Sequence, residues 1–259
     1  MNESSQRRAL VRYSLAMHRA GWVANHDGNL SARVREDRII CTPTAFGKAD
    51  VTLDDLVVVD ANGKKIAGQQ RPFSELILHR AVYAARGEIN AVVHAHPPMA
   101  TAFGAAGQPI PHPFLPEAVV SLGPQIPLVP LTAPGAPGVE ALRPWIRRCD
   151  AVIIAGNGVL AWGPTLELAY LRLELVEHLA KIAHHALALG GVTPVPKTLL
   201  DALLAKRKKA GLAAPEEGLA PGSSQGTDRV MARVRAAIPN ADPQRIAALA
   251  EQIARQIQG

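Results

Sequence analysis

The sequence predicts an α/β sandwich, a fold in which helices pack against the faces of a β-sheet. An amphipathic helical pattern covers residues 6–20, and a longer one covers residues 165–189. Between them lie short β-branched apolar segments, of which residues 89–95 are typical of a buried strand. Because helical and strand patterns are mixed along the chain, they favour a sandwich over a helical bundle or a barrel.

The first half of the chain contains two predicted helices and several short strands. Residues 6–20 carry apolar side chains near helical spacing, and Gly21 ends this pattern. Residues 71–85 predict a second helix, with Pro72 in its first turn. The strands that we expect in this half are residues 29–34, 38–41, 57–60 and 89–95.

The second half combines a loop-rich stretch with a long helix. Residues 107–138 are rich in proline and glycine, so we expect mostly loops and short strands there. Residues 151–155 have the pattern of a buried strand. Residues 165–189 predict a long helix that ends at Gly190. Its expected apolar stripe consists of Leu168, Leu171, Leu175, Leu179, Ile182 and Ala186. A further helix is predicted near residues 199–209.

The composition changes after residue 210 and divides the chain into three parts. We expect a folded domain over residues 1–210, a flexible linker over residues 211–227 and an amphipathic helical tail over residues 228–259. A linker followed by such a helix resembles the encapsulation peptides that send enzymes into bacterial microcompartments, where the apolar stripe docks on a shell protein. The alternative is a tail that packs on its own domain or on a neighbouring subunit.

The composition excludes several classes of protein. Of the 259 residues, 48% are hydrophobic and 19% are charged, which is typical of a globular chain and excludes wholesale disorder. No apolar run is long enough to span a membrane, and residues 1–8 lack the apolar core of a signal peptide. Because Cys41 and Cys149 are far apart and form no CxxC motif, we expect a reducing, cytoplasmic location.

The net charge of +6 raises the question of an anionic partner. The densest basic run, residues 206–209, has no interleaved aromatic residues and no zinc knuckle beside it. We therefore expect a solvated helix end there rather than a nucleic-acid surface. A small anionic substrate would also suit a basic protein.

His94-Ala95-His96 is the sharpest chemical signal in the sequence. In a strand, residues i and i+2 point to the same face, so the two imidazoles can converge on one metal ion. The pair ends a predicted buried strand just before Pro97 turns the chain into a loop, and functional sites collect at such ends. From these residues alone, two loop histidines without a metal are an equally good interpretation.

Glu75 offers a carboxylate close to this pair. It lies in the first turn of the predicted helix over residues 71–85, which has to pack back against the His94 strand. A carboxylate beside a metal can abstract a proton from carbon or oxygen. Taken alone, an acidic residue that complements the helix dipole is the simpler explanation.

Two small polar segments have the composition of phosphate-binding loops. One contains Asn29 and Ser31, the other contains Thr44, and each lies next to a predicted strand. Backbone N–H groups and hydroxyls of such loops can cradle a phosphate, although ordinary turns explain both segments equally well.

Five motifs in this order resemble the class II aldolase/adducin family over about residues 6–190. The resemblance implies a three-layer α/β/α sandwich with a mainly antiparallel sheet, usually assembled as a tetramer with sites between subunits. The motifs are Gly28-Asn29-Leu30-Ser31-Ala32-Arg33, Thr42-Pro43-Thr44, Ser74-Glu75 with His79, Val92-Val93-His94-Ala95-His96-Pro97, and Gly158-Val159-Leu160-Ala161-Trp162-Gly163.

The resemblance implies a lyase of carbohydrate metabolism that cleaves or forms a fuculose- or rhamnulose-1-phosphate-like sugar phosphate. In the family, zinc polarises the substrate oxygens and stabilises an enediolate. Carried over, His94 and His96 are zinc ligands and Glu75 is the acid/base. Sugar-phosphate epimerases and dehydratases share this chemistry, whereas the adducin head keeps the fold without the metal ligands. A non-catalytic binding or scaffold protein is therefore the alternative from another class.

The metal motif departs from the family at one ligand. The third zinc histidine of the family corresponds to Asn157, whose amide oxygen is a neutral and harder ligand. Zinc should therefore bind more weakly, or another divalent cation should be preferred. Glu117 is a candidate for a compensating ligand, and a surface-loop carboxylate is the alternative interpretation.

The phosphate motif and the proton donor of the aldolases also differ. Phe73 stands where the family commonly has serine, and Ala45 stands where it has glycine. The tyrosine that donates a proton in the fuculose-phosphate enzyme aligns near Leu115, so that role is vacant or filled by another group. The residues that remain for a phosphate are Asn29, Ser31, Thr44, Ser74 and Lys48.

Overall fold

A computed structural model describes residues 2–217 of the chain. Met1–Pro215 form one compact unit, and Glu216–Gly259 are assigned to a second. The expected tail over residues 228–259 and most of the expected linker lie outside the described residues. Within the described part, no helix combines the length and the apolar character that a membrane crossing requires.

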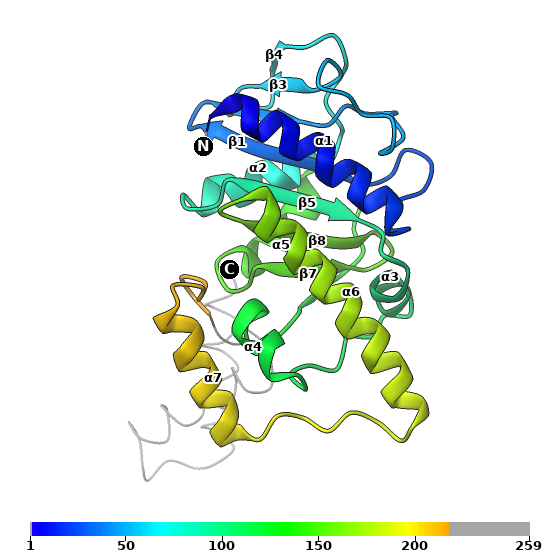
Figure 1. Cartoon of the computed structure of the whole chain (residues 1–259), viewed down its shortest axis with the longest axis vertical. Coiled ribbons are helices and arrows are strands. Elements are labelled where there is room, and N and C mark those ends of the chain that lie inside the picture. Colours follow the sequence, from blue (N-terminus) through cyan, green and yellow to red (C-terminus); the bar gives the residue numbers. More distant parts are fainter. Residues whose placement is uncertain (1, 218–259) are drawn as a thin grey trace, which may run out of the picture. The chain divides into compact units, whose positions relative to one another are not determined.

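One eight-stranded sheet forms the centre of the first unit (Figure 1). Its strands are β1 (Asn29–Arg35), β2 (Arg38–Cys41), β3 (Val57–Val59), β4 (Lys65–Ala67), β5 (Ala91–Ala95), β6 (Leu128–Val129), β7 (Ala151–Ile154) and β8 (Gly158–Gly163). Their order across the sheet is β4-β3-β2-β1-β5-β8-β7-β6, and every pair is antiparallel except β6 with β7. The expectation of a mainly antiparallel sheet is confirmed.

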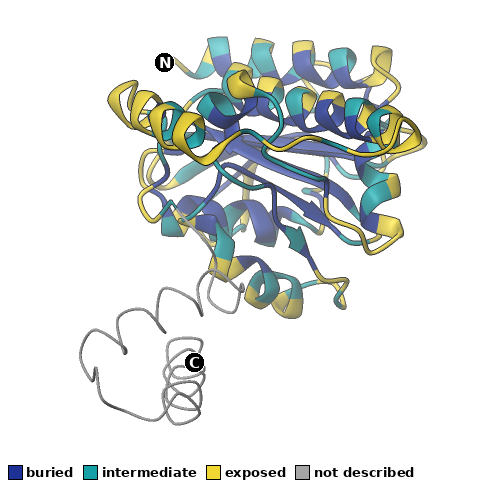
Figure 2. Ribbon diagram, turned by 90° about the horizontal axis from the view of Figure 1, so that it is seen from below, coloured by how far each residue is buried: buried dark blue, intermediate teal, exposed yellow. Residues whose placement is uncertain are grey.

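Helices cover both faces of the sheet and complete the expected three layers. The helices are α1 (Glu3–Arg19), α2 (Leu76–Ala85), α3 (Pro98–Ala105), α4 (Pro116–Leu122), α5 (Ala136–Ile146), α6 (Leu166–Ala188) and α7 (Lys197–Lys209). One core cluster joins α1, α3, α4 and α6 to one face, and a second joins α2 and α5 to the other. Figure 1 shows α1 and α6 in front of the sheet, and Figure 2 shows the buried strands between two helical layers with exposed outer faces.

The extent of helix α6 agrees with the sequence prediction, but its buried face does not. The Thr165 side chain accepts a hydrogen bond from the backbone N–H of Leu168 at 3.1 Å and so caps the first turn. The predicted stripe is wrong in its position, because only Leu179 of its six residues is buried and Leu171 is 45% exposed. The sheet covers a neighbouring face of the helix, on which apolar residues also recur every three or four positions. The buried apolar positions are Leu166, Ala169, Leu173, Val176, Leu179, Ala180 and Ala183.

The expected start of the second helix at residue 71 is wrong, and the correction matters for function. A β-bridge joins Pro43 to Pro72, and the Thr44 N–H donates to the Arg71 carbonyl at 3.0 Å. These contacts hold the segment before α2 against the loop after β2. Because the helix begins at Leu76, Glu75 is its N-cap residue rather than a member of its first turn.

The expectation of mostly loops over residues 107–138 is wrong where α4 lies, and the sequence did not predict α5. Both helices carry proline in the first two positions, Pro116 in α4 and Pro137 in α5. Proline is tolerated there because those N–H groups have no partner inside the helix. In the sequence alone, the same residues count as helix breakers.

Asp150 is the centre of a buried cluster of charges. Its carboxylate pairs with Arg86 at 2.7 Å, Arg172 at 2.8 Å and Arg207 at 2.6 Å, and its side chain is fully buried. Burial lowers the pKa of Arg172 to about 10 even though Asp150 raises it. The prediction of a solvated helix end for residues 206–209 is wrong for Arg207, which ties α7 to the sheet and donates to the Ser121 carbonyl.

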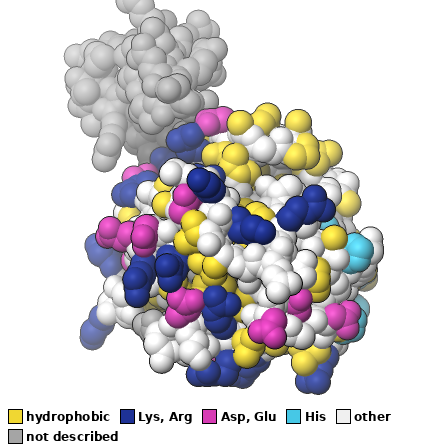
Figure 3. Space-filling model, turned by 90° about the horizontal axis from the view of Figure 1, so that it is seen from above, with side chains coloured by type: hydrophobic (Ala, Val, Ile, Leu, Met, Phe, Trp, Pro, Cys, Tyr) yellow, Lys and Arg dark blue, Asp and Glu magenta, His cyan; other side chains and the backbone are white. Residues whose placement is uncertain are grey.

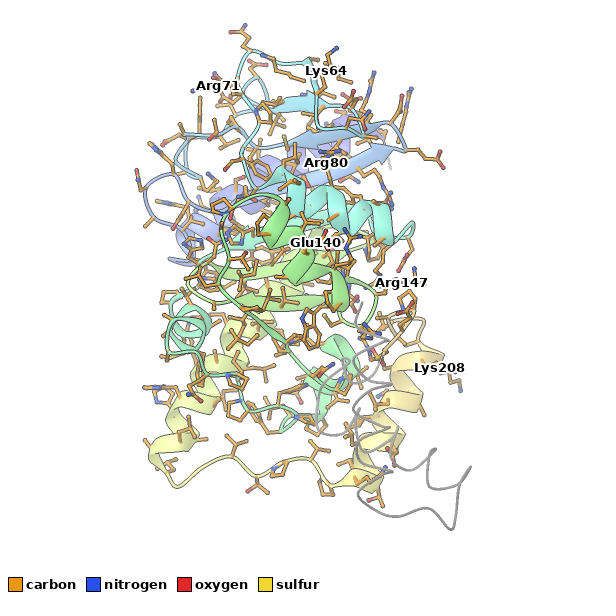
Figure 4. All side chains as sticks on the ribbon, turned by 180° about the vertical axis from the view of Figure 1, so that it is seen from behind. Lys64, Arg71, Arg80, Glu140, Arg147 and Lys208 are labelled. Carbon is orange, nitrogen blue, oxygen red and sulfur yellow. The ribbon has the colours of Figure 1, made fainter. Side chains whose placement is uncertain are left out.

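Exposed charges on the first unit are mixed in sign. Figure 3 looks onto the end of the sheet that carries β3 and β4, and lysine and arginine side chains alternate there with acidic ones. Figure 4 shows the face of α2 and α5, where Arg71, Arg80 and Arg147 are spread apart and Glu140 lies among them.

We expect Asp150→Asn to destabilise the protein strongly, by about 3–5 kcal/mol, because it leaves three buried guanidinium groups without their shared counter-charge. Urea denaturation followed by circular dichroism measures the change. The control is Glu140→Gln, which breaks an exposed pair with Arg143 and should leave the midpoint unchanged. Equal midpoints for both variants would contradict a stabilising role for the cluster.

Candidate functional site

The pairing of three strands brings the predicted site residues together. Asn29, at the start of β1, lies opposite His94 near the end of β5. On the other side of β5, His94 pairs with Leu160 of β8, next to the turn that carries Asn157. Glu75 enters from the N-cap of α2. The structure therefore gathers side chains that lie far apart in the sequence at the ends of three neighbouring central strands.

Each ring of the His94 and His96 pair has an oxygen atom beside its Nδ1. His94 Nδ1 lies 3.0 Å from the Val159 carbonyl, which can only accept, so this nitrogen carries the proton. His96 Nδ1 lies 3.2 Å from Asp27 Oδ2, within ion-pair distance of that carboxylate. When His94 is neutral its lone pair is therefore on Nε2, and this atom lies 3.2 Å from Nε2 of His96.

Two imidazole nitrogens at this distance either share one proton or bind a common cation. Imidazole nitrogens whose other N–H is held by a carbonyl or a carboxylate are the usual ligands of zinc and related ions. The donor set therefore fits a divalent cation. Among residues 2–217, no three His, Cys, Asp or Glu side chains are gathered as a complete metal site. The amide of Asn157, the substrate or water would have to supply the remaining ligands.

Glu75 presents an ionised carboxylate to the same space. Oε2 lies 3.5 Å from His94 Nε2 and accepts from Asn29 Nδ2 at 2.9 Å, while Oε1 accepts from Asn157 Nδ2 at 2.6 Å. Burial raises the pKa of Glu75, but His94 and the two amide hydrogen bonds outweigh burial and hold it below its ordinary value. Burial also lowers the pKa of His94, while the Glu75 carboxylate beside it acts in the opposite direction.

Comparison with known proteins decides the family. The sequence model described as "Class II Aldolase and Adducin N-terminal domain" matches residues 8–184. The chain belongs to the class II aldolase and adducin family.

Relatives within this family carry out more than one reaction. A 3-oxo-tetronate 4-phosphate decarboxylase of Haemophilus influenzae is 28% identical over 70% of this chain and 88% of its own length. A 5-deoxy-D-ribulose 1-phosphate aldolase of Bacillus thuringiensis is 26% identical over 78% of this chain and 94% of its own. A solved L-fuculose 1-phosphate aldolase is 26% identical, covers 80% of this chain and 98% of its own and superimposes with a TM-score of 0.74.

Two residues expected to bind a phosphate in this class II aldolase fold are engaged elsewhere. Ser31 is fully buried, and its hydroxyl lies 2.8 Å from His79 Nδ1 and 2.7 Å from the Tyr83 hydroxyl. Lys48 is only 2% exposed, and its Nζ donates to the Phe46 carbonyl at 2.8 Å. Burial lowers the pKa of Lys48.

Thr44 and Ser74 are accessible and lie in neighbouring loops. The bridge between Pro43 and Pro72 brings these loops together, Thr44 is half-buried and Ser74 is exposed. Asn29 is only 5% exposed, and its amide nitrogen is engaged by Glu75. The accessible part of the expected phosphate set is therefore Thr44 and Ser74 with the loop backbone.

Glu117 is not brought to the histidines. It is exposed in the first turn of α4 and lines a cavity with residues of α6 such as Leu168 and Arg172. None of the groups around His94 and His96 lines that cavity. The structure gives no support to Glu117 as a ligand from the same chain.

The sequence analysis missed Asp27 and the buried network behind Glu75. Asp27 directly precedes the Gly28-Asn29 motif, and no spacing rule marked it as a partner of His96. His79 lies one helical turn after Glu75, and burial lowers its pKa to about 3, so it is neutral. The contact of His79 with Ser31 explains why both residues belong to the family motifs although neither is exposed.

Ala45 provides a test of the altered phosphate loop. Its φ is +59°, a left-handed conformation that costs an L-residue about 1–2 kcal/mol and costs glycine almost nothing. We expect Ala45→Gly to raise the free energy of unfolding, by up to about 1 kcal/mol after the entropy of the unfolded chain is counted. The control Ala49→Gly, at an exposed position without positive φ, should lower it by about 0.4–1 kcal/mol. Thermal denaturation distinguishes them, and shifts of the same sign would contradict the strain at Ala45.

Proposed function

We propose that the protein is a divalent-metal-dependent lyase that breaks a carbon–carbon bond next to a carbonyl group in a small phosphorylated substrate, such as a sugar phosphate. One observation carries the proposal: the Nε2 atoms of His94 and His96 converge at 3.2 Å beside the ionised Glu75. The membership in the class II aldolase and adducin family supports it. Zinc is the cation that the paired imidazoles favour, and another divalent cation is the alternative because of Asn157.

The residues of the site have distinct tasks in this proposal. His94 and His96 hold the cation, and the Asn157 side-chain oxygen is available as a further ligand. When bound, the cation polarises the substrate oxygens and stabilises the negative charge that develops as the bond breaks. The N–H groups and hydroxyls of the loops at Thr44 and Ser74 bind the phosphate. Asn29 positions Glu75 through its 2.9 Å hydrogen bond.

Glu75 moves the proton in an aldol cleavage. Its carboxylate accepts the proton of the hydroxyl group on one side of the breaking bond. The electron pair of that bond passes to the carbon next to the carbonyl group, and the former hydroxyl carbon leaves as an aldehyde. Glu75 then gives the proton to the new carbanionic carbon and regains its negative charge.

Decarboxylation is the second candidate, and Leu115 is the observation that favours it. In an aldol reaction a second acid/base group can exchange the proton at the aldehyde oxygen, accepting it in cleavage and donating it in condensation, and the residue that aligns near this group is aliphatic. Loss of carbon dioxide from a 3-oxo acid needs no such group, because only the remaining carbon takes up a proton. The similarity to the Haemophilus decarboxylase supports this candidate as well.

The assembly and the location remain predictions. We propose a homotetramer with sites between subunits, as the resemblance implies, and sedimentation analysis measures the number of chains. Delivery to a bacterial microcompartment by residues 228–259 would require a tail helix that binds a shell protein.

Elemental analysis of the purified protein, paired with substrate assays, tests the proposed function. We expect stoichiometric divalent metal. Aldehyde release from fuculose- or rhamnulose-1-phosphate would favour the aldolase, and carbon dioxide release from a 3-oxo-tetronate 4-phosphate would favour the decarboxylase. If no metal can be loaded and neither substrate is turned over, a non-catalytic binding protein with this fold is the better conclusion.

We expect Glu75→Gln to lower kcat by about 10²–10⁴-fold while the metal stays bound, because the amide cannot take up the proton and the histidines are unchanged. Steady-state kinetics and metal analysis on the same preparation measure both effects. The control is Glu88→Gln, which removes a half-exposed carboxylate beside Arg86. Wild-type kcat in Glu75→Gln would remove Glu75 from the proton transfer.

We expect Asn157→His to tighten zinc binding by on the order of tenfold or more, because it restores a third imidazole. Calorimetric titration of zinc into metal-free protein measures the affinity. Asn157→Ala is the companion variant and should weaken binding if the amide oxygen contacts the ion. Unchanged affinity in both variants would mean that residue 157 lies outside the metal's coordination sphere.

A further inference from the structure

We propose that Asp27 is a positioning residue that locks the tautomer and the orientation of His96 and makes its Nε2 a stronger metal ligand. The inference rests on the proposed metal site and deepens it. Its basis is the ion pair of Asp27 Oδ2 with His96 Nδ1 at 3.2 Å, in a loop that the site does not otherwise use.

Both oxygens of Asp27 have a partner. While Oδ2 faces His96, Oδ1 accepts a hydrogen bond from the Ala24 N–H at 2.6 Å. The carboxylate is therefore held by its own loop and presents one oxygen to the imidazole. A side chain that is anchored in this way can fix the orientation of its partner, which a freely rotating surface carboxylate cannot.

The loop that carries Asp27 is fixed to the strand end. The backbone N–H of His96 donates to the Trp22 carbonyl at 2.9 Å, so the loop contacts the backbone of His96 as well as its ring. Gly28 has a φ of +68° and lies so close to β5 that a Cβ there would be 3.1 Å from the His94 carbonyl oxygen. On the other side, Lys48 Nζ contacts the His26 carbonyl at 3.4 Å. The buried Lys48 thus supports this loop.

His96 needs such a partner more than His94 does. His94 is buried within β5, and its Nδ1 bonds to the backbone of the neighbouring strand. His96 lies just beyond the strand end, its side chain is 31% exposed, and Asp27 is the partner of its Nδ1. Without the carboxylate, the ring would be free to rotate or to carry its proton on Nε2, and either change removes the lone pair from the metal.

The charge of Asp27 is also relevant to Asn157, which stands where the family resemblance implies a third histidine ligand. A neutral amide replaces an imidazole at that position and donates less electron density to a cation. A carboxylate that accepts Nδ1–H raises the basicity of the ligating imidazole. Asp27 therefore strengthens one of the two remaining nitrogen ligands in a site that lacks the third.

Zinc titration and nitrogen NMR on the full chain test the inference. Metal-free wild type, Asp27→Asn, Asp27→Ala and the control Asp54→Asn are each titrated calorimetrically with zinc; Asp54 is an exposed aspartate in the turn before β3. We expect zinc affinity to fall by about 10–100-fold in Asp27→Ala. It should fall less in Asp27→Asn, whose amide oxygen still accepts from Nδ1, and Asp54→Asn should match wild type.

The side-chain ¹⁵N shifts of metal-free protein give a readout that is independent of zinc and of activity. We expect His96 to be the Nδ1–H tautomer in wild type and a mixture of tautomers in Asp27→Ala, with unchanged thermal unfolding. Wild-type affinity and a single tautomer in Asp27→Ala would overturn the inference and leave the proposed function intact. A wild type that binds no zinc or other divalent cation would overturn the proposed function together with the inference. An equal loss of zinc affinity in Asp54→Asn would indicate a general effect of removing a negative charge and would also overturn the inference about Asp27.

Discussion

The antiparallel pairing of β5 with β1 on one side and β8 on the other is the constraint on which the site depends. It sets Asn29 opposite His94 and gives His94 Nδ1 its acceptor, the Val159 carbonyl of β8. The turn into β8 passes so close to β5 that a Cβ on Gly158 would collide with the Ala95 carbonyl. A shift of one residue in this register would turn His94 to the opposite face and dismantle the cluster.

The chemistry of the site depends on which polar atoms donate hydrogen bonds and which accept them. Oxygen atoms lie beside both Nδ1 atoms and leave the two Nε2 atoms to face each other, and two amide donors help to hold the pKa of Glu75 down despite burial. The imidazole nitrogens and the negative carboxylate beside them together favour the binding of a positive charge. In this chain, Asn157 contributes through its amide to Glu75, where the family has a histidine.

The two ends of the β7–β8 hairpin have different roles: one end stabilises the fold and the other faces the site. At its open end, Asp150 holds three arginines in the core, and Arg172 also donates to the Trp162 carbonyl at 2.7 Å. At its closed end lies the turn with Asn157, which faces the site. The buried ion pairs hold one end of the hairpin in place. The side chains of the turn at the other end therefore need not contribute to packing and can serve the site.

The sequence by itself determined the sandwich, the extent of the long helix α6 and the buried strand that leads to His94-Ala95-His96, because hydrophobic periodicity and local motifs are properties of short segments. The role of Glu75 beside these histidines came from the family resemblance, and the structure places the carboxylate there. Only the tertiary structure decided that Ser31 and Lys48 are buried, that Glu117 lies elsewhere and that Asp27 meets His96. It also decided the start of α2, through the contact of Pro72 with Pro43. These outcomes depend on contacts between residues distant along the chain, which no local pattern encodes.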